Sequence, residues 1–226
     1  MEIGIEIVPS NLPRFLRSLS SVIGYADFIS LPECPFGRPL PSPLILSVIA
    51  KGLGLEAIPN YRVMDRSELG FISEMMALSE VGVRRIVIVR GDLPSIGMPT
   101  NLNPVRAIEL IKEHGIDIDV GVATYVKPSE TLRAKIEAGA DFVITQPIQD
   151  VEELSELLDF LGDIPLYTMI MPGLEDLDPN VLKEMGLKEV RNVDYKALLQ
   201  DISRTKVRGV IISSPKGVSK ALEILR

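Results

Sequence analysis

The sequence of 226 residues predicts an α/β fold, and more specifically a (β/α)8 TIM barrel. Short β-branched or apolar runs recur along the chain, and each is followed by a longer amphipathic segment, an alternation typical of a parallel sheet covered by helices. Eight such runs are present, which is the number of strands in this barrel. An open doubly wound sheet is the alternative, but no Gly-x-Gly-x-x-Gly motif follows the first run.

The expected strands are almost continuously apolar, as strands buried on both faces are. They span residues 3–8, 26–31, 56–61, 84–90, 119–124, 141–145, 166–170 and 207–213. Between them, residues 65–68 are expected to open one helix, Pro104 is expected to open another, and Ser129 is expected to cap a third. The segment 178–205 is longer than one helix and is expected to hold two, split near Arg191.

Length and composition predict one domain over residues 1–226, because α/β barrels of roughly 200–250 residues form single units and no linker interrupts the chain. The formal net charge of −7 argues against a nucleic-acid partner, which needs clustered Lys and Arg. The most apolar stretch, residues 43–50, is far shorter than the roughly 20 residues that span a bilayer. The acidic N-terminus is unlike a signal peptide, so we expect a cytoplasmic protein. Because the charge argues against nucleic acid, we expect the ligand to be a small molecule.

Three strand ends carry polar residues that packing does not explain. Glu6 lies in an apolar strand, where a carboxylate is costly to bury unless it is paired with a cation or used in chemistry. Arg90, Gly91 and Asp92 follow the fourth strand and could bind a flat, charged ligand, or could form only a turn with a local ion pair. Gln146 closes the sixth strand and offers donors and acceptors for a heterocycle edge.

Other reactive residue types are poorer candidates. His114, the only histidine, falls at the end of a helix, and Cys34, the only cysteine, has no histidine to activate it. A single cysteine also excludes an internal disulfide and a multi-Cys metal site. The lysines Lys51, Lys112 and Lys135 fall in expected helices, which counts against a lyase or aldolase with a Schiff-base lysine inside the barrel.

Five segments at or near these strands share a pattern with one known family. They are EIVPS (6–10), DFIS (27–30), IVIVRGDLP (86–94), VGVATY (120–125) and KIEAGADFVITQPIQD (135–150). In order and spacing they resemble the motifs of the methylenetetrahydrofolate reductase family, whose members are flavin-dependent (β/α)8 barrels. The resemblance extends from residue 6 to about residue 172.

The resemblance implies a role for each matching residue. Glu6 would be the general acid that opens the five-membered ring of a methylene-pterin, and Asp92 would stabilise the cationic iminium by its charge. Gln146 and Glu6 would contact the pterin. The residues implied in flavin binding are Asn60, Arg90, Gly91, Asp92, Tyr125 and Lys135.

The chain also departs from the family pattern. Pro32 stands where the family has Thr, Asn60 where it has His, and Pro147 where an aromatic residue is usual, and the loop after Tyr125 is shorter. These departures fall mainly on the side that would hold the phosphate and adenosine of the flavin. The resemblance therefore implies FAD, with the smaller FMN, or a pocket completed by a partner, as alternatives.

The implied reaction is hydride transfer from reduced flavin to a methylene-tetrahydrofolate or analogous pterin, with NAD(P)H or a protein as electron donor, in one-carbon metabolism and methionine biosynthesis. A pterin-binding subunit without its own tightly bound flavin is the alternative function. The short apolar helix expected near residues 43–52 is poorly covered by polar residues, so we also expect a homo-oligomer or a partner subunit.

Overall fold

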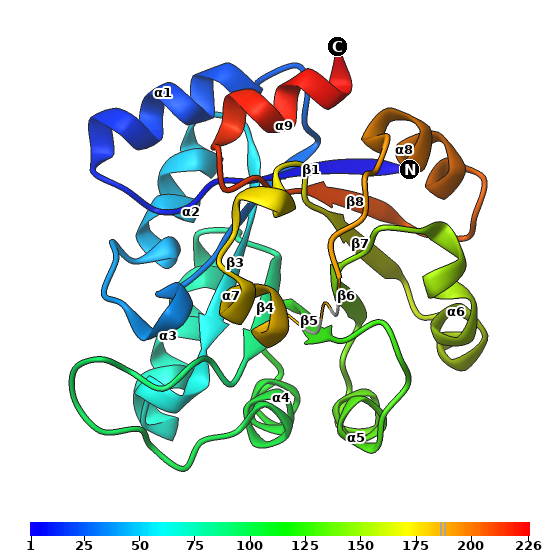
Figure 1. Cartoon of the computed structure of the whole chain (residues 1–226). Helices are drawn as coiled ribbons and strands as arrows, with labels where there is room; N and C mark the ends of the chain where they lie inside the picture. Colours follow the sequence, from blue (N-terminus) through cyan, green and yellow to red (C-terminus); the bar gives the residue numbers. More distant parts are fainter. Residues whose placement is uncertain (186, 188) are drawn as a thin grey trace.

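Eight parallel strands close into a barrel in the computed structural model, which describes residues 1–185, 187 and 189–226 (Figure 1). Each strand pairs with the next, and β1 pairs with β8 to close the sheet. The strands are β1 (Glu2–Glu6), β2 (Phe28–Leu31), β3 (Glu56–Arg62), β4 (Arg85–Val89), β5 (Asp119–Thr124), β6 (Phe142–Pro147), β7 (Leu166–Ile170) and β8 (Gly209–Ile212). The predicted (β/α)8 barrel is confirmed, with strand limits that differ from the expected ones by at most two residues.

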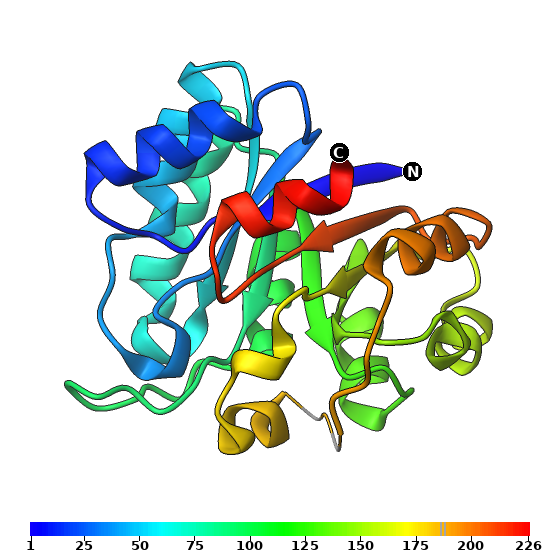
Figure 2. The same cartoon turned by 45° about the horizontal axis from the view of Figure 1, so that its top comes forward.

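Helices surround the barrel. They are α1 (Leu12–Val22), α2 (Pro43–Gly52), α3 (Glu68–Glu80), α4 (Pro104–Glu113), α5 (Glu130–Glu137), α6 (Ser155–Leu161), α7 (Pro179–Glu184), α8 (Tyr195–Ser203) and α9 (Val218–Leu225). One of them, α7, lies at the end of the barrel (Figure 2). The expected cap at Ser129 forms, since its hydroxyl accepts a hydrogen bond from the Leu132 amide, and the Ser67 hydroxyl caps α3 in the same way through the Gly70 amide. The predicted split of 178–205 is also confirmed, because α7 and α8 lie on either side of Arg191.

Short 3₁₀ turns follow several strands and lead toward the same end of the barrel. They are η1 (Pro35–Gly37), η2 (Val63–Asp65), η3 (Val151–Leu154) and η4 (Leu174–Asp176). In Figure 2 the long connection between β4 and α4 extends from the end of the barrel that also carries α7. Pro147 is the last residue of β6, one residue beyond Gln146, and a register shift against β7 pairs it with Met169. A strand edge at such an irregularity tolerates a residue without an N–H.

A group of ion pairs and hydrogen bonds around Arg85 closes the N-terminal end of the barrel. Arg85 donates to Glu2 at 2.8 Å, to Glu56 at 2.7 Å and to the Tyr167 hydroxyl at 2.7 Å. Above this group, apolar side chains fill the middle of the barrel: Phe28, Ile58, Val87, Phe142, Ile144, Tyr167 and Ile211. Among the described residues, the interior is thus filled at its N-terminal end and middle, which leaves the C-terminal end for a ligand.

Glycines make room for the aromatic rings in this filling. A Cβ on Gly4 would lie 2.4 Å from the Phe28 ring, and one on Gly121 would lie 2.2 Å from the Phe142 ring. These contacts are far shorter than real Cβ contacts, so both positions need glycine. Among the described residues, no helix is long and apolar enough to cross a membrane.

Candidate functional site

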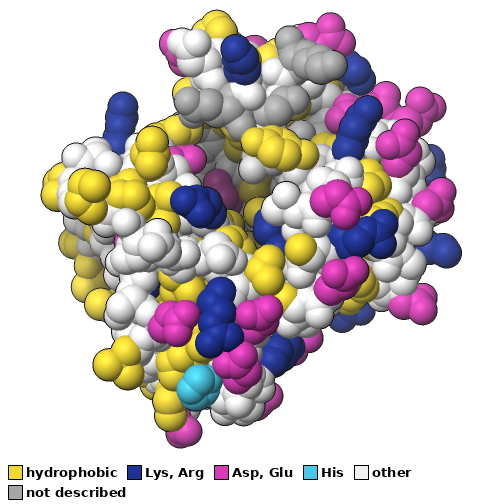
Figure 3. Space-filling view, turned by 90° about the horizontal axis from the view of Figure 1, so that it is seen from below, with side chains coloured by type: hydrophobic (Ala, Val, Ile, Leu, Met, Phe, Trp, Pro, Cys, Tyr) yellow, Lys and Arg dark blue, Asp and Glu magenta, His cyan; other side chains and the backbone are white. Residues whose placement is uncertain are grey.

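A cavity of about 520 Å³ opens at the C-terminal ends of the strands. This volume lies within the range of small-molecule sites, and barrels of this kind place their active sites at this end. Figure 3, a view from below, shows a hollow near the centre of the molecule, bordered by hydrophobic side chains and by Lys or Arg. The residues that the sequence singled out and that line the cavity are Glu6, Asn60, Arg90, Gly91, Asp92, Lys135 and Gln146. The structure thus brings together residues from five segments of the chain.

Glu6 ends β1 with its side chain in the cavity, because alternate residues of a strand face the barrel interior. The Ser213 hydroxyl, at the end of β8, donates a hydrogen bond of 2.7 Å to Glu6 Oε1. Burial raises the pKa of Glu6 above its ordinary value, and the hydrogen bond from Ser213 opposes this only in part. Among the described residues no Lys or Arg forms an ion pair with Glu6, so the alternative of a paired structural carboxylate does not apply.

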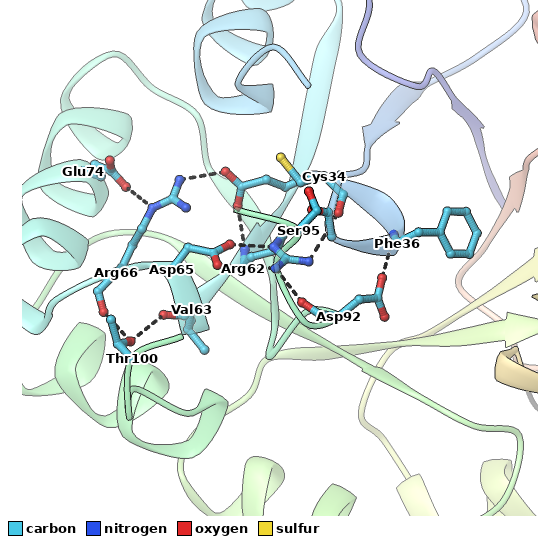
Figure 4. Close-up of polar contacts among 12 residues, drawn as sticks. Cys34, Phe36, Arg62, Val63, Asp65, Arg66, Glu74, Asp92, Ser95 and Thr100 are labelled. Carbon is cyan, nitrogen blue, oxygen red and sulfur yellow. Dashed lines mark hydrogen bonds and ion pairs between the residues drawn. The ribbon is translucent and has the colours of Figure 1, made fainter. Parts of the chain in front are cut away.

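Asp92 lies on the connection that follows β4, on the same cavity as Glu6. Its Oδ2 accepts a hydrogen bond of 2.7 Å from the Phe36 amide, and its backbone carbonyl accepts one of 2.6 Å from Arg62 Nη2 (Figure 4). The Asp92 carboxylate is therefore attached to the loop after β2 as well as exposed to the cavity. The sequence left open a local ion pair between Arg90 and Asp92. The described residues do not form this pair.

Arg62 is a buried cation that sequence reasoning missed. It is only 1 % exposed, and its guanidinium donates to Asp65 Oδ2 at 2.6 Å, to the Cys34 carbonyl at 3.3 Å and to Asp92 as above. Gly91 packs directly on it, since a Cβ there would lie 2.8 Å from Arg62 Cζ. Arg62 therefore joins the loops that follow β2, β3 and β4.

Glu33 completes this group of charges. Its Oε2 accepts a hydrogen bond from the Arg62 amide at 2.7 Å, and its Oε1 accepts one from Arg66 Nη2 at 2.7 Å. Burial raises the pKa of Glu33, although the charge of Arg66 opposes the shift. In the sequence, Glu33 follows one apolar strand and Arg62 ends the next. Their charges could have been noticed there, but only the three-dimensional structure shows that the two residues are in contact.

Two amide side chains face the cavity between these groups. Asn60 lies in β3, and its Oδ1 is buried without a hydrogen-bond partner among the described residues. A buried acceptor without a partner is costly, so a ligand donor at this position would be stabilising. Gln146 lies in β6, half-buried on the same cavity.

Cations also line the cavity. Lys135 belongs to α5, as expected, but its side chain reaches the cavity and its Nζ donates to the Ala123 carbonyl at 3.0 Å. Burial lowers the pKa of Lys135. Arg90 is exposed at the rim. Tyr125 follows β5, is 59 % exposed and does not line this cavity, so a role for it requires a ligand that extends beyond the cavity.

The other two reactive residues, His114 and Cys34, do not line the cavity. His114 caps the end of α4, where its Nδ1 lies 2.9 Å from the Leu110 carbonyl. Cys34 is a free cysteine, and its carbonyl is held by Arg62.

Comparison with known proteins gives the same family as the motifs. The family model of methylenetetrahydrofolate reductase matches residues 28–178. A 5,10-methylenetetrahydrofolate reductase of Pectobacterium carotovorum subsp. carotovorum is 34 % identical over 140 residues, which are 58 % of this chain and 47 % of that protein. The Salmonella typhimurium protein of the same name is 32 % identical over 142 residues, with the same coverage. The chain spans about half the length of these curated relatives.

Solved structures share the fold. A protein from Clostridium thermocellum, described as binding two copies of 5-methyl-5,6,7,8-tetrahydrofolic acid, superimposes with a TM-score of 0.72 at 16 % identity, covering 99 % of this chain and 93 % of that one. A 2,3-dimethylmalate lyase superimposes with a TM-score of 0.57 at 13 % identity, covering 94 % and 75 %. The matched region holds Asn60, Asp92, Lys135 and Gln146, whereas Glu6 lies outside it, in the preceding strand β1. On its sequence and its fold, the chain belongs to the methylenetetrahydrofolate reductase family.

Proposed function

We propose that this protein reduces the methylene group of 5,10-methylenetetrahydrofolate, or of an analogous methylene-tetrahydropterin, to the 5-methyl form. The observation that carries the proposal is Glu6, a carboxyl group that shares a cavity with Asp92 and Gln146 and that forms no ion pair within the part of the chain that the structure describes. The family relationship supports the substrate class. The reduced folate bound by the Clostridium thermocellum protein is consistent with such a ligand on this fold.

Glu6 is suited to give a proton to the substrate. A carboxyl group acts as a general acid near neutral pH only when its pKa is raised, and burial has this effect on Glu6. Protonation of a ring nitrogen by Glu6 opens the five-membered ring and leaves a cationic iminium on the substrate. Asp92 provides a negative charge on the same cavity, which stabilises that cation.

Gln146 and Asn60 would orient the pterin and the cofactor. A carboxamide presents both a donor and an acceptor, as the edge of a pterin does, and Gln146 has this capacity on the cavity. The buried Asn60 Oδ1 needs a donor, and an N–H of a flat heterocycle would satisfy it.

The residues present fit a flavin in part. Asn60, Arg90, Gly91 and Lys135 line the cavity and would hold it, with the two cations toward its ribityl or phosphate oxygens. A bound flavin, reduced by NAD(P)H or by a protein donor, would supply the hydride. Because Tyr125 does not line the cavity, the smaller FMN remains an alternative to FAD in this proposal.

A pterin-binding subunit without its own flavin is the second candidate. The position of Tyr125 outside the cavity favours it, because one of the residues implied in flavin binding does not contribute there. In that case another protein would supply the electrons, and Glu6 and Asp92 would keep the same roles toward the pterin.

The visible spectrum of the purified protein separates these candidates. We expect a flavin absorbance band, either as purified or after addition of FMN or FAD and removal of the excess, and we expect the band to bleach with NAD(P)H or dithionite. Calorimetry that detects reduced folate binding but no flavin binding selects the second candidate. A protein that binds neither ligand contradicts both.

A further inference from the structure

The loop after β2 holds two bulky residues in an unfavourable backbone conformation. Phe36 has φ +57° and ψ +25°, and Cys34 has φ +44°. Among the described residues, these are the two non-glycine residues with positive φ. This left-handed region is unfavourable for residues with a Cβ, and such strain persists only where the surrounding structure imposes it and often marks a functional site.

Contacts from the end of β3 and from the loop after β4 impose this conformation. The Phe36 amide donates to Asp92 Oδ2, and the Cys34 carbonyl accepts from Arg62. On the other side of Phe36, the Gly37 carbonyl accepts from both the amide and the hydroxyl of Ser95, each at 2.9 Å. The strained loop is thus held from both ends.

The Phe36 ring contributes little hydrophobic burial to the folded protein. Its residue is 49 % exposed, and it does not belong to the apolar core. In Figure 4 its ring points away from the group around Arg62. It lines the cavity that also holds Glu6 and Asp92, and it is the only aromatic residue that does so among the described residues.

We infer that Phe36 is the stacking surface for the flat heterocycle bound in this cavity, a residue that sets affinity and specificity; this rests on the proposed function. Pterin and flavin rings both present a π-face, and stacking on an aromatic ring stabilises such a ligand. The hydrogen bond from the Phe36 amide makes Asp92 the residue that positions the ring, so one carboxylate both faces the substrate and fixes the stacking surface.

Backbone strain separates this role from a structural one. Glycine adopts positive φ without the penalty that Phe pays, so Phe36→Gly should keep or raise the melting temperature while it removes the ring. Affinity should fall about ten-fold or more, the usual loss when an aromatic stacking partner is removed. Phe36→Tyr should restore affinity, and Phe36→Leu, which is apolar but lacks a π-face, should not.

The test uses the full chain and two probes, 5-methyltetrahydrofolate and FMN, in separate titrations by calorimetry. Ile96 is another exposed apolar residue, which lies in the β4–α4 connection and off the cavity, so Ile96→Ala is the matched control and should bind both probes as wild type does. Weaker binding of either probe by Phe36→Gly supports the inference and identifies the stacked ligand. Wild-type affinity of Phe36→Gly for every probe that wild type binds would overturn it and leave the proposed function intact. If wild type binds neither probe, both fail.

A fluorescence reporter checks the contact directly. The chain contains no tryptophan, so Phe36→Trp introduces a single tryptophan at the cavity, which can be excited selectively. Saturable quenching of its emission by a probe is the expected result, and Ile96→Trp should show none. Equal response of the two variants contradicts stacking at Phe36.

Discussion

Glu6 depends on one neighbour for its protonation state. Burial raises its pKa, and the Ser213 hydroxyl, which donates to the carboxylate, is the group that opposes the shift. The charged residues that face the same cavity are Glu33, Arg62, Arg90, Asp92 and Lys135, and none of them forms an ion pair with Glu6 among the described residues. Removal of the Ser213 hydroxyl should therefore act on Glu6 alone.

For Ser213→Ala we expect a shift in the pH dependence of the reductase reaction. Loss of the donated hydrogen bond destabilises the ionised carboxylate and raises the pKa of Glu6 further. A general acid works only while protonated, so the pH above which activity declines should move upward. The pH profile of kcat measures this, and Ser213→Thr, which keeps the hydroxyl, should restore the wild-type profile. An unchanged profile in Ser213→Ala contradicts the assignment.

Stability should depend on pH through the same residue. Because the folded state raises the pKa of Glu6, the bound proton stabilises it at low pH, and this contribution is lost as the pH rises through the raised value. Glu6→Gln carries no charge at any pH, so it should be more stable than wild type at pH 8 and similar at pH 4. A gain on the order of 1 kcal/mol corresponds to about 2–4 °C in Tm. A lower Tm for Glu6→Gln at pH 8 would contradict this.

At the scale of elements, the loops after β2, β3 and β4 form one unit around Arg62. Its guanidinium contacts each loop, and Gly91 leaves the space that it occupies. The strands place these loops at the same end of the barrel, and the buried cation fixes their relative positions. The shape of the cavity wall therefore depends on one side chain.

Two glycines of the same connection provide a matched test. Gly91 (φ +92°) and Gly97 (φ +83°) both have positive φ, but a Cβ on Gly97 would meet no atom within 4 Å, whereas one on Gly91 would meet Arg62. Gly97→Ala should cost about 1–2 kcal/mol from its backbone alone. Gly91→Ala should cost roughly 1–3 kcal/mol more, because the pinned guanidinium must shift. Chemical denaturation measures both, and equal losses would show that Arg62 is not fixed as the structure indicates.

At the scale of the whole molecule, α2 presents apolar side chains to solvent. Ile45 is 65 % exposed and Val48 is 39 % exposed on this helix. We expect self-association or a partner subunit through this face. Analytical ultracentrifugation should show an oligomer for wild type and a lighter species for Ile45→Glu, whereas a monomeric wild type would remove the expectation of self-association.

The sequence predicted the barrel and part of its site for physical reasons. Strand period and glycine or proline punctuation are local signals, so the strands were placed to within two residues. Glu6 stood out because a carboxylate in an apolar strand needs an explanation. Arg62 and Phe36 did not stand out, because local preferences disfavour a buried Arg and a Phe with left-handed backbone angles. Both are stabilised by contacts between loops that are distant in sequence. Residues 1–226 as a single domain and the cytoplasmic location stay predictions.

The most direct measurement is the formation of 5-methyltetrahydrofolate from 5,10-methylenetetrahydrofolate by wild type and by Glu6→Gln, each with FMN or FAD and dithionite. We expect product with wild type and a rate lower by about 10²- to 10⁴-fold with Glu6→Gln, the usual contribution of a general acid, while affinity for 5-methyltetrahydrofolate changes little. Equal rates for the two proteins, or binding of the folate without product from either, would contradict the account.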